Sequence, residues 1–589
     1  MTPALGGSGA TPPSVELAAE EVALYQRTYS TLLRSTGETD LRVLEAAHRA
    51  MASSLHPHAA EEDVLDLGAF MYATARLPAE VFRATRIVMG QEASQFTKAG
   101  IGPLDDWEPV EAVARRRRWF AAPPPAADDD PAGPLTYAVL LSSTSDLDDL
   151  VPTLVAFQIE WNKLRRKLRG VGWPRPQKTP GADDCTRALG GSQDDWARLQ
   201  EVWGTAFAAR LGDVATREMR LRIRMLGGSA VGYARMTRHW FRPIRTAIDA
   251  TGLQDGPVYF VSSNTHSLAN LVSGEARAME DELVDWVRRE GPRDLREEVR
   301  AFDTGATRGS WENFLYYAAR DYHVAHPRQA ARRRDAERGA GVVHLGSTTA
   351  LSVAAQVTAV RDLDPARLDP RIGGVDTAAL AASRGVIVNV DYPLGLAAYN
   401  ILREICEDAD TLSSVYVLGK AATLNADVGD VLISSVVHDE HSNTTYWLDN
   451  AFGVEDIAPY LRFGSGLDNQ RAVTVKSTFL QNRTYLDFYY REAYTVVEME
   501  AGPYCAAVYE VADSARYPIG QHVNFSKLPI DFGIIHYASD TPYTQARTLG
   551  ARGLNYRGMD STYASSIAIL RRILSREGAL STRTTAETR

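Results

Sequence analysis

The sequence TVVEMEAGPY, at residues 495–504, ends an apolar run in two glutamates. Alternate residues of a strand share a face, so Glu498 and Glu500 are expected on the same side of a sheet. Pro503 suits the first turn of a helix, where its missing N–H costs little. The stretch therefore predicts a strand that ends in two carboxylates and leads into a helix. Ligands of open α/β sheets bind at such an edge, although pairing of a glutamate with an arginine is an equally good interpretation.

Closely spaced apolar runs surround this stretch from about residue 340 onward. The runs are GVVHLG, GVIVNV, SSVYVLG, DVLISSVVH, AVTVKSTF, YTVVEME and FGIIHYAS. Helical patterns separate some of them, as in GLAAYNILREICEDA, and STYASSIAILRRILSREG reads as a closing helix. This alternation predicts an α/β sheet with helices on its faces, beginning near residue 338.

The part of the chain before residue 338 is richer in helical patterns. Two strand–turn–helix units begin at Leu135 and Pro257, each with a hydroxyl-rich turn. Such a turn suits an anion, although N-capping by Ser, Thr and Asp is the simpler interpretation. For His266 in the second turn, the simpler interpretation is a histidine whose hydrogen bonds are satisfied within the turn. The full expected division is a disordered tail at 1–14, a helical region at 15–122, an α/β or helix-rich domain of unknown role at 135–336, a second α/β domain at 338–578 and a disordered tail at 579–589.

Bulk properties limit the function classes. A chain of 589 residues is too long for one core. Its net charge of −10 disfavours nonspecific binding of nucleic acid. The three cysteines form no C-x-x-C pair, which suits a reducing compartment, and no apolar stretch reaches membrane-spanning length. We therefore expect a cytoplasmic protein without a nucleic-acid or membrane partner.

Six segments of the second half, in order, resemble the purine nucleoside phosphorylase/nucleosidase superfamily, whose members cleave the N-glycosidic bond of nucleosides. They are VVHLGSTTALS, VIVNVDYPLGLAAYNILREI, VYVLGKAATLNADVGDVLIS, VTVKSTFLQ, VVEMEAGPY and IIHYASD. The resemblance covers roughly residues 341–575. It implies a three-layer α/β/α domain with a mixed sheet, a nucleoside or nucleotide as the small-molecule partner, and a homo-oligomer.

The resemblance also implies roles for individual residues. Glu500 would bind the ribose hydroxyls with support from Glu498, Met499 would pack near the sugar, and Phe479 would stack on the base. At the end of the last strand, Asp540, with Ser539, would protonate or hydrogen-bond the purine N7. A general acid of this kind lowers the barrier by about 10²–10⁴-fold, and a carboxyl group needs burial or a neighbouring carboxylate to stay protonated.

The nucleophile side departs from the family pattern. Ser347 and Thr348 would hold phosphate or the attacking water, but their loop lacks the glutamate of the family's nucleosidases, which favours inorganic phosphate as co-substrate. The family's Gly-rich turn is replaced by Gly419-Lys420-Ala421-Ala422. Lys420 next to Gly419 would either contact phosphate or fill the pocket. The second outcome motivates a rival hypothesis, a non-catalytic nucleotide sensor. Neither HVAH nor HDEH lies on a metal scaffold, so we expect no metal and no cofactor.

Overall fold

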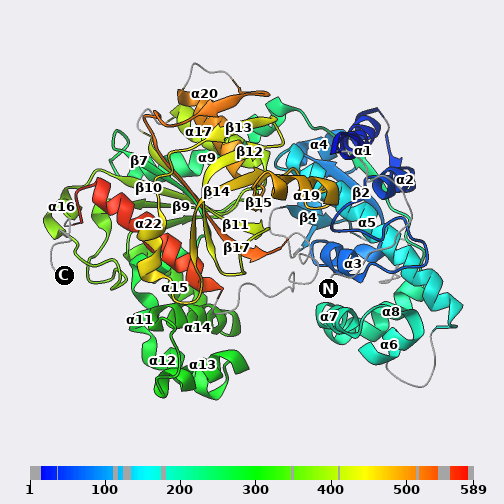
Figure 1. Ribbon diagram of the computed structural model, residues 1–589, viewed down its shortest axis with the longest axis horizontal. Coiled ribbons are helices and arrows are strands. Elements are labelled where there is room, and N and C mark those ends of the chain that lie inside the picture. The colour runs from blue at the N-terminus through cyan, green and yellow to red at the C-terminus, as the bar shows by residue number, and fades with distance from the viewer. Residues whose placement is uncertain are drawn as a thin grey trace, which may run out of the picture.

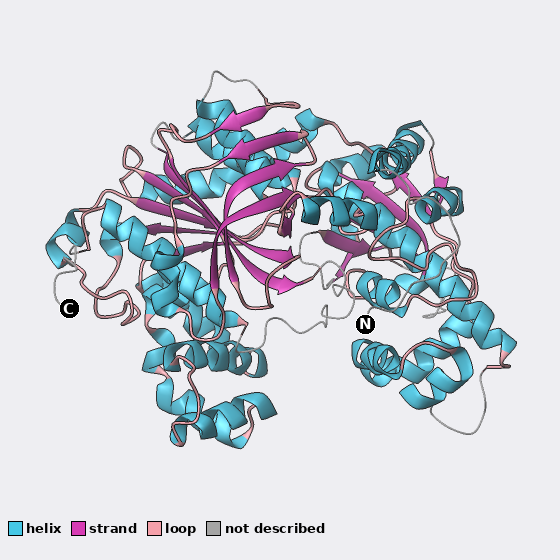
Figure 2. Ribbon diagram, in the orientation of Figure 1, coloured by secondary structure: helices cyan, strands magenta, loops and turns pink. Residues whose placement is uncertain are grey.

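The computed structural model describes residues 15–35, 37–110, 117–123, 134–173, 181–346, 351–408, 412–512, 517–541 and 558–580. Within these ranges the protein is a mixed α/β structure with two separate sheets (Figures 1 and 2). The expected tail at 1–14 lies outside the described residues, as does most of the expected tail at 579–589.

The smaller sheet belongs to the first half of the chain and has the strand order β1-β6-β2-β5-β4-β3. Its strands are β1 (Thr39–Asp40), β2 (Ala84–Gly90), β3 (Glu108–Val110), β4 (Arg118–Ala121), β5 (Leu135–Leu140) and β6 (Arg222–Met225). β6, β2 and β5 are parallel, whereas β1, β3 and β4 join in antiparallel fashion. The expectation of a helical region at 15–122 is therefore incomplete, because four of these strands fall inside it beside four helices.

Helices of the first half pack around the long helix α5. The helices are α1 (Val15–Ser35), α2 (Arg42–Ala50), α3 (Leu67–Thr74), α4 (Ala93–Lys98), α5 (Thr144–Gly170), α6 (Ala182–Leu189), α7 (Gln193–Trp203) and α8 (Phe207–Thr216). α5 contacts α2, α3 and α8, and its side chains from Leu150 to Trp161 are all buried. A helix that is covered on every side needs apolar residues all round, which explains why this segment lacks a clear amphipathic pattern.

The larger sheet has the strand order β16-β13-β12-β14-β15-β11-β7-β10-β9-β8, and β17 pairs with both β11 and β12. Its strands are β7 (Val258–Ser262), β8 (Val342–Leu345), β9 (Ala355–Ala359), β10 (Val386–Val390), β11 (Leu412–Thr423), β12 (Val431–Asp439), β13 (Thr444–Trp447), β14 (Gly466–Thr474), β15 (Val496–Glu498), β16 (His522–Asn524) and β17 (Asp531–Asp540). The seven apolar runs predicted as strands are all present.

β7 lies in the middle of this sheet although it precedes the expected boundary at residue 338. Ser262 at its end pairs with Val390 of β10 and with Val417 of β11, and all three strands are parallel. The boundary near 338 therefore does not separate the two sheets. The division falls between β6 and β7, because a strand belongs to the sheet with which it pairs.

Helices cover both faces of the larger sheet. They are α9 (Ala230–Ala250), α10 (Ser267–Ser273), α11 (Glu275–Ala278), α12 (Glu280–Arg289), α13 (Arg293–Asp303), α14 (Trp311–Ala325), α15 (Gln329–Gly339), α16 (Thr377–Ala382), α17 (Leu396–Asp408), α18 (Val454–Ile457), α19 (Arg483–Arg491), α20 (Ala501–Ala512) and α22 (Met559–Arg576). Tyr416 and Leu418 of β11 pack in one core with α10, α14 and α22. Val415 and Val417 pack in a second core with α9, α17 and α20, so alternate residues of one strand face opposite layers.

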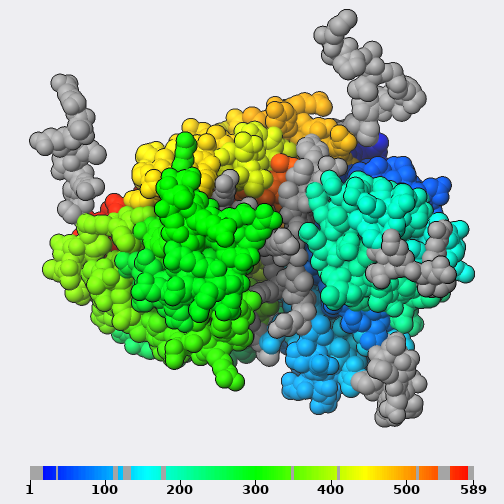
Figure 3. Space-filling model, turned by 90° about the horizontal axis from the view of Figure 1, so that it is seen from below, coloured from blue at the N-terminus to red at the C-terminus, as the bar shows by residue number. Residues whose placement is uncertain are grey.

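The two halves meet along the segment that follows β14. An isolated antiparallel bridge joins Ser53 to Asn482, and Leu480 packs in the core of the smaller sheet. Seen from below, the helices α12–α14 and α6–α8 form two lobes, one on each half of the molecule (Figure 3). No helix in the described part of the chain has the length and apolar character that a membrane span requires.

Candidate active site

Glu498 is the last residue of β15, and its carboxylate caps the start of α20. One oxygen accepts the backbone N–H groups of Glu500 and Ala501, both at 2.7 Å, and the other accepts the hydroxyl of Thr474. The same hydroxyl oxygen accepts the N–H of Gly502 at 2.8 Å. Glu498 therefore satisfies backbone donors at a helix start and is committed to shaping the turn.

Glu500 lies in the short bend between β15 and α20, so strand alternation does not reach it. Its side chain is buried. Burial raises the pKa of Tyr504, Ser262 lowers it, and the Glu500 carboxylate raises it further. The backbone N–H of Tyr504 donates to the carbonyl of Glu500 at 3.2 Å, so Glu500 lies one helical turn before Tyr504. Met499 between the two glutamates packs beside a small apolar cluster that includes Val497.

Asp540 ends β17 and pairs with Ala422 of β11. Ala422 also pairs with Val497 of β15, so a single residue of β11 lies between the strand of the proposed acid and the strand of the glutamates. Ser539 is partly buried and its hydroxyl donates to the carbonyl of Ala421 at 3.3 Å. The structure thus brings the expected base-side and sugar-side residues to the same part of the sheet.

The segment Gly419–Ala422 is not a turn. It continues β11, whose 12 residues end at Thr423, with an irregularity in the pairing with β17 after Ala421. A Cβ on Gly419 would approach the His536 ring to 3.0 Å, which explains a small residue there. Lys420 is exposed, in contrast to the buried residues on either side of it. The expected Gly-rich turn is therefore replaced by regular strand that carries a lysine.

The strand with the nucleophile loop was expected at VVHLGSTTALS, but β8 lies at the end of the larger sheet, away from β11. Ser347 and Thr348 lie outside the described residues. The strand that lies directly beside β11 is β7, and the turn after it is SSNTHS. In that turn Asn264 Oδ1 accepts the backbone N–H groups of His266 at 3.0 Å and of Ser267 at 2.6 Å.

Positive charge surrounds this turn. Burial, together with the charges of Arg333, Arg320 and Lys420 and against the charge of Glu337, lowers the pKa of His266 to about 4. Arg333 is paired with Glu337 at 2.7 Å, whereas Arg320 lies 3.9 Å over the ring of Tyr317 and contacts Asp321. Lys420 lies three residues beyond Val417, which pairs with Ser262 at the end of the parallel strand β7, so Lys420 is at the level of the turn that follows β7.

Phe479 does not line the sheet edge as an exposed ring. It is fully buried in a cluster of Leu55, Ala69, Tyr72 and Ala156, all from the first half of the chain. The Tyr72 ring meets it edge-on with 5.2 Å between centroids, and the imidazoles of His48 and His56 lie at 6.0 and 6.3 Å. Its position therefore joins the two halves of the molecule.

Helix α3 carries Tyr72, which the sequence did not identify, to the segment that follows β14. The Tyr72 hydroxyl donates to Thr478 Oγ1 at 2.8 Å. Burial raises the pKa of Tyr72, Arg76 lowers it, and both Asp149 and Asp540 raise it. The Arg76 guanidinium lies 3.5 Å over the Tyr72 ring. Helical periodicity places Tyr72 on a buried face, but no local signal indicates which partner covers that face.

The HDEH sequence forms a junction between the two halves. Asp439 accepts His441 Nδ1 at 2.9 Å, and His441 Nε2 lies 3.2 Å from Ser145 Oγ at the start of α5. Glu440 accepts the hydroxyl of Tyr489 at 2.9 Å. Ser145 is fully buried and already accepts the N–H of Leu396, so this row of side chains connects elements and offers no exposed nucleophile. Among the residues described, no group of three or more His, Cys, Asp or Glu side chains is arranged to hold a metal ion.

A model of a protein family of unknown function, DUF6909, matches residues 41–575. The chain belongs to this family. The DUF6909 match begins before α2 and ends in α22, so the family model includes strands of both sheets. The comparison with curated proteins gave no match.

Solved structures similar to this DUF6909 protein include two nucleoside-related enzymes. A 5′-methylthioadenosine/S-adenosylhomocysteine nucleosidase from Colwellia psychrerythraea, in complex with adenine, is 14% identical with a TM-score of 0.27, over 39% of this chain and 86% of that one. A uridine phosphorylase from Schistosoma mansoni, in complex with 5-fluorouracil, is 9% identical with a TM-score of 0.28, over 55% of this chain and 88% of that one. Similarities at this level assign no function.

Proposed function

We propose that this protein cleaves the N-glycosidic bond of a nucleoside or nucleotide and releases the free base. The observation that carries the proposal is the placement of Ala422 of β11, which pairs with both Asp540 and Val497. The expected acid and the expected ribose-binding glutamate, Glu500, are 40 residues apart in sequence, and Ala422 lies between Asp540 and Val497, which precedes Glu500 by three residues. A retained pair of this kind is what glycosidic cleavage requires, because positive charge develops on the sugar while negative charge develops on the base.

The reaction divides between these groups. Glu500 accepts hydrogen bonds from the ribose hydroxyls, and its negative charge favours a sugar that becomes oxocarbenium-like. Asp540 donates a proton or a hydrogen bond to the leaving base as the bond from C1′ to the base nitrogen breaks. An oxygen of phosphate forms the new bond to C1′, and the products are the free base and the sugar 1-phosphate. Glu498 holds the turn that positions Glu500 and takes no direct part.

Phosphate is favoured over water because of the charges around the turn after β7. Lys420, Arg320 and Arg333 act on His266 there, and Asn264 fixes two backbone N–H groups of the turn. Cations and backbone donors at the end of a parallel strand suit an anion. We assign the phosphate role to this turn and to Lys420. The earlier assignment to Ser347 and Thr348 stays a prediction, since neither residue is described.

A specific observation also supports the second candidate, a nucleotide sensor without catalysis. Gly419–Ala422 is regular strand, and the exposed lysine within it occupies the place of a flexible Gly-rich turn. Such a strand holds a bound anion more rigidly than a turn does. Under this alternative Glu500 and Lys420 still bind ligand, but Asp540 does not transfer a proton.

Purified protein incubated with purine and pyrimidine nucleosides and their 5′-monophosphates, with and without phosphate, separates the two functions. Chromatography of the products should show free base, with a phosphate-dependent rate. Calorimetry with Asp540→Asn completes the test. If the enzyme hypothesis holds, this variant binds the nucleoside with nearly unchanged affinity but releases base about 10²–10⁴-fold more slowly. Binding by the wild type without any free base favours the sensor.

A further inference from the structure

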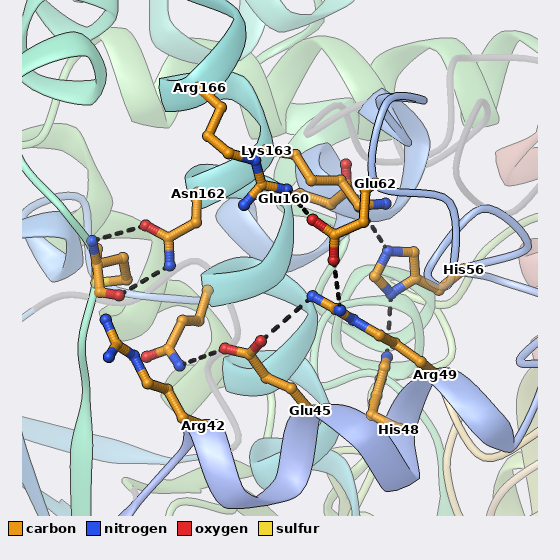
Figure 4. A network of polar contacts seen from close by, with 12 residues as sticks. Arg42, Glu45, His48, Arg49, His56, Glu62, Glu160, Asn162, Lys163 and Arg166 are labelled. Carbon is orange, nitrogen blue, oxygen red and sulfur yellow. Dashed lines mark hydrogen bonds and ion pairs between the residues drawn. The ribbon is translucent and has the colours of Figure 1, made fainter.

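A buried row of polar side chains in the first half of the chain lies against the ring of Phe479. Figure 4 shows three of its members, His48, His56 and Glu160. His56 Nε2 lies 2.9 Å from Glu160 Oε1, and His56 Nδ1 lies 3.0 Å from His48 Nε2. His48 Nδ1 lies 3.3 Å from the hydroxyl of Tyr25. Each of these four side chains is at most 1% exposed. We call Tyr25, His48, His56 and Glu160 the histidine chain.

The protons of the histidine chain have a consistent direction. Side-chain hydrogen bonding and charge from His56 and Lys163 lower the pKa of Glu160 against the effect of burial, so it is a carboxylate and accepts only. His56 must then donate from Nε2. Burial, with the charges of His56, Arg49 and Lys163, lowers the pKa of His48, so this imidazole is neutral. The tautomer that donates from Nε2 to His56 and accepts from Tyr25 at Nδ1 fits these contacts. Every member is satisfied, and such a network favours one geometry over others.

Glu160 also anchors helix α3. Its second carboxylate oxygen accepts the backbone N–H of Asp66 at 2.8 Å. Asp66 is the N-cap of α3, where its side chain accepts the N–H of Ala69. One turn further along, Tyr72 donates to Thr478 and contacts the Phe479 ring. Two series of contacts therefore lead from Glu160 to the neighbouring residues Thr478 and Phe479. One passes through the histidines and the other through α3.

The segment that both routes reach is loop 475–482, between β14 and α19. The first half of the chain holds its far end, because Asn482 Nδ2 donates to the Met51 carbonyl and Ser54 N–H donates to the Gln481 carbonyl, each at 2.7 Å. At its near end the N–H of Val475 donates to the carbonyl of Glu498 at 2.8 Å. Loop 475–482 thus connects the histidine chain directly to the turn that carries Glu500.

We propose that the histidine chain and Tyr72 position loop 475–482 at the candidate site, so that the first half of the chain sets how tightly the second half binds its ligand. The four residues of the histidine chain are positioning residues, since none of them reaches the sheet edge. This proposal rests on the proposed function for its effect on substrate binding. The position of the loop itself is measurable without any reaction.

The test uses full-length protein with 4-fluorophenylalanine incorporated at position 479. Tyr72→Phe removes one hydroxyl and keeps the ring, and His48→Gln interrupts the histidine chain. His323→Gln is the matched control, because His323 is also a buried histidine beside a carboxylate, Glu275, but lies in α14. Circular dichroism and melting temperature establish that each variant is folded. Tyr72→Phe keeps the experiment decisive if His48→Gln fails to fold.

We expect the ¹⁹F resonance to shift or divide in Tyr72→Phe and His48→Gln and to stay unchanged in His323→Gln. In nucleoside cleavage assays the same two variants should raise KM about 3- to 10-fold, the equivalent of one neutral hydrogen bond, with kcat within about two-fold. A wild-type ¹⁹F spectrum in both variants overturns the proposal, whether or not any nucleoside is cleaved. A loss of kcat that parallels the loss of melting temperature also overturns it. Failure of the proposed function shows itself separately, as absence of free base from the wild type.

Discussion

The carboxylate of Glu498 accepts the backbone N–H of Glu500 at 2.7 Å, so the first glutamate of the VEMEA sequence holds the second in place. This hydrogen bond gives different roles to two glutamates that the sequence pattern does not distinguish. It gives Glu498 a structural role and leaves Glu500 as the residue that we propose for ligand contact.

Substitution of Glu498 should therefore lower stability, whereas substitution of Glu500 should lower activity. Glu498→Gln leaves backbone donors of α20 and the Thr474 hydroxyl poorly matched, so we expect a loss of about 1–3 kcal/mol in the free energy of unfolding. Glu500→Gln should unfold like the wild type but lower kcat/KM by about 10-fold or more, because it removes a charge-assisted hydrogen bond. Urea unfolding and steady-state kinetics measure the two effects. An equal loss of stability in both variants would contradict the assignment of a structural role to Glu498 alone.

Gly502 should not tolerate a side chain. A Cβ at this position would lie 2.5 Å from the Cβ of Asp439, so Gly502→Ala should destabilise the protein by about 1–3 kcal/mol through overpacking. Gly212 in α8 is the control, since a Cβ there meets nothing within 4 Å and alanine favours the helix by up to about 1 kcal/mol. Denaturant unfolding compares the two variants. The prediction fails if Gly502→Ala is as stable as Gly212→Ala.

The histidine chain should make the protein sensitive to mild acid. Burial lowers the pKa of His48 in the native state, so below the unfolded value of about 6.5 the unfolded chain binds more protons than the native one. The free energy of unfolding should therefore fall as the pH drops from about 7.5 to about 5.5. His48→Gln should lose much of this pH dependence, measured by urea titration at both pH values. His266, whose pKa is lowered to about 4, contributes in the same direction in both proteins. An unchanged pH slope in the variant would argue against a neutral native His48.

Phosphate should raise the pKa of His266. An anion near the turn after β7 offsets the charges of Arg320, Arg333 and Lys420, which together with burial hold this pKa near 4. NMR of ¹³C-labelled histidines, with His266→Gln for assignment, follows the titration with and without phosphate. Lys420→Gln should reduce the shift. A pKa of His266 that does not respond to phosphate would place the anion elsewhere.

Local patterns predicted much of the larger sheet. The seven apolar runs after residue 340 are strands, and the strand–turn–helix units at Leu135 and Pro257 are β5–α5 and β7–α10. The order in which these strands pair within the sheet could not be predicted from local patterns. Hydrogen bonds between strands join residues far apart in sequence, so nothing local to PVYFVS indicates that it inserts between β10 and β11.

The roles given to the site residues stay predictions, but the structure shows where these residues lie. Glu500 and Asp540 stand out by residue type and position, and the structure brings their strands together at Ala422. Two features were missed. GKAA contains a glycine and reads as a turn, yet strands on both sides of β11 extend it through this stretch. Tyr72 contacts Thr478 across 406 positions of sequence, and no periodicity reveals a contact between two separately folded sheets.

The central claim is N-glycosidic cleavage, and release of free base by the wild type tests it most directly. A nucleoside panel is incubated with purified protein and phosphate, free base is measured by chromatography, and ³¹P NMR of the same samples detects sugar 1-phosphate. The account predicts both products from the wild type and a rate about 10²–10⁴-fold lower for Asp540→Asn. Absence of free base from every nucleoside and nucleotide, or an equal rate in Asp540→Asn, would contradict it.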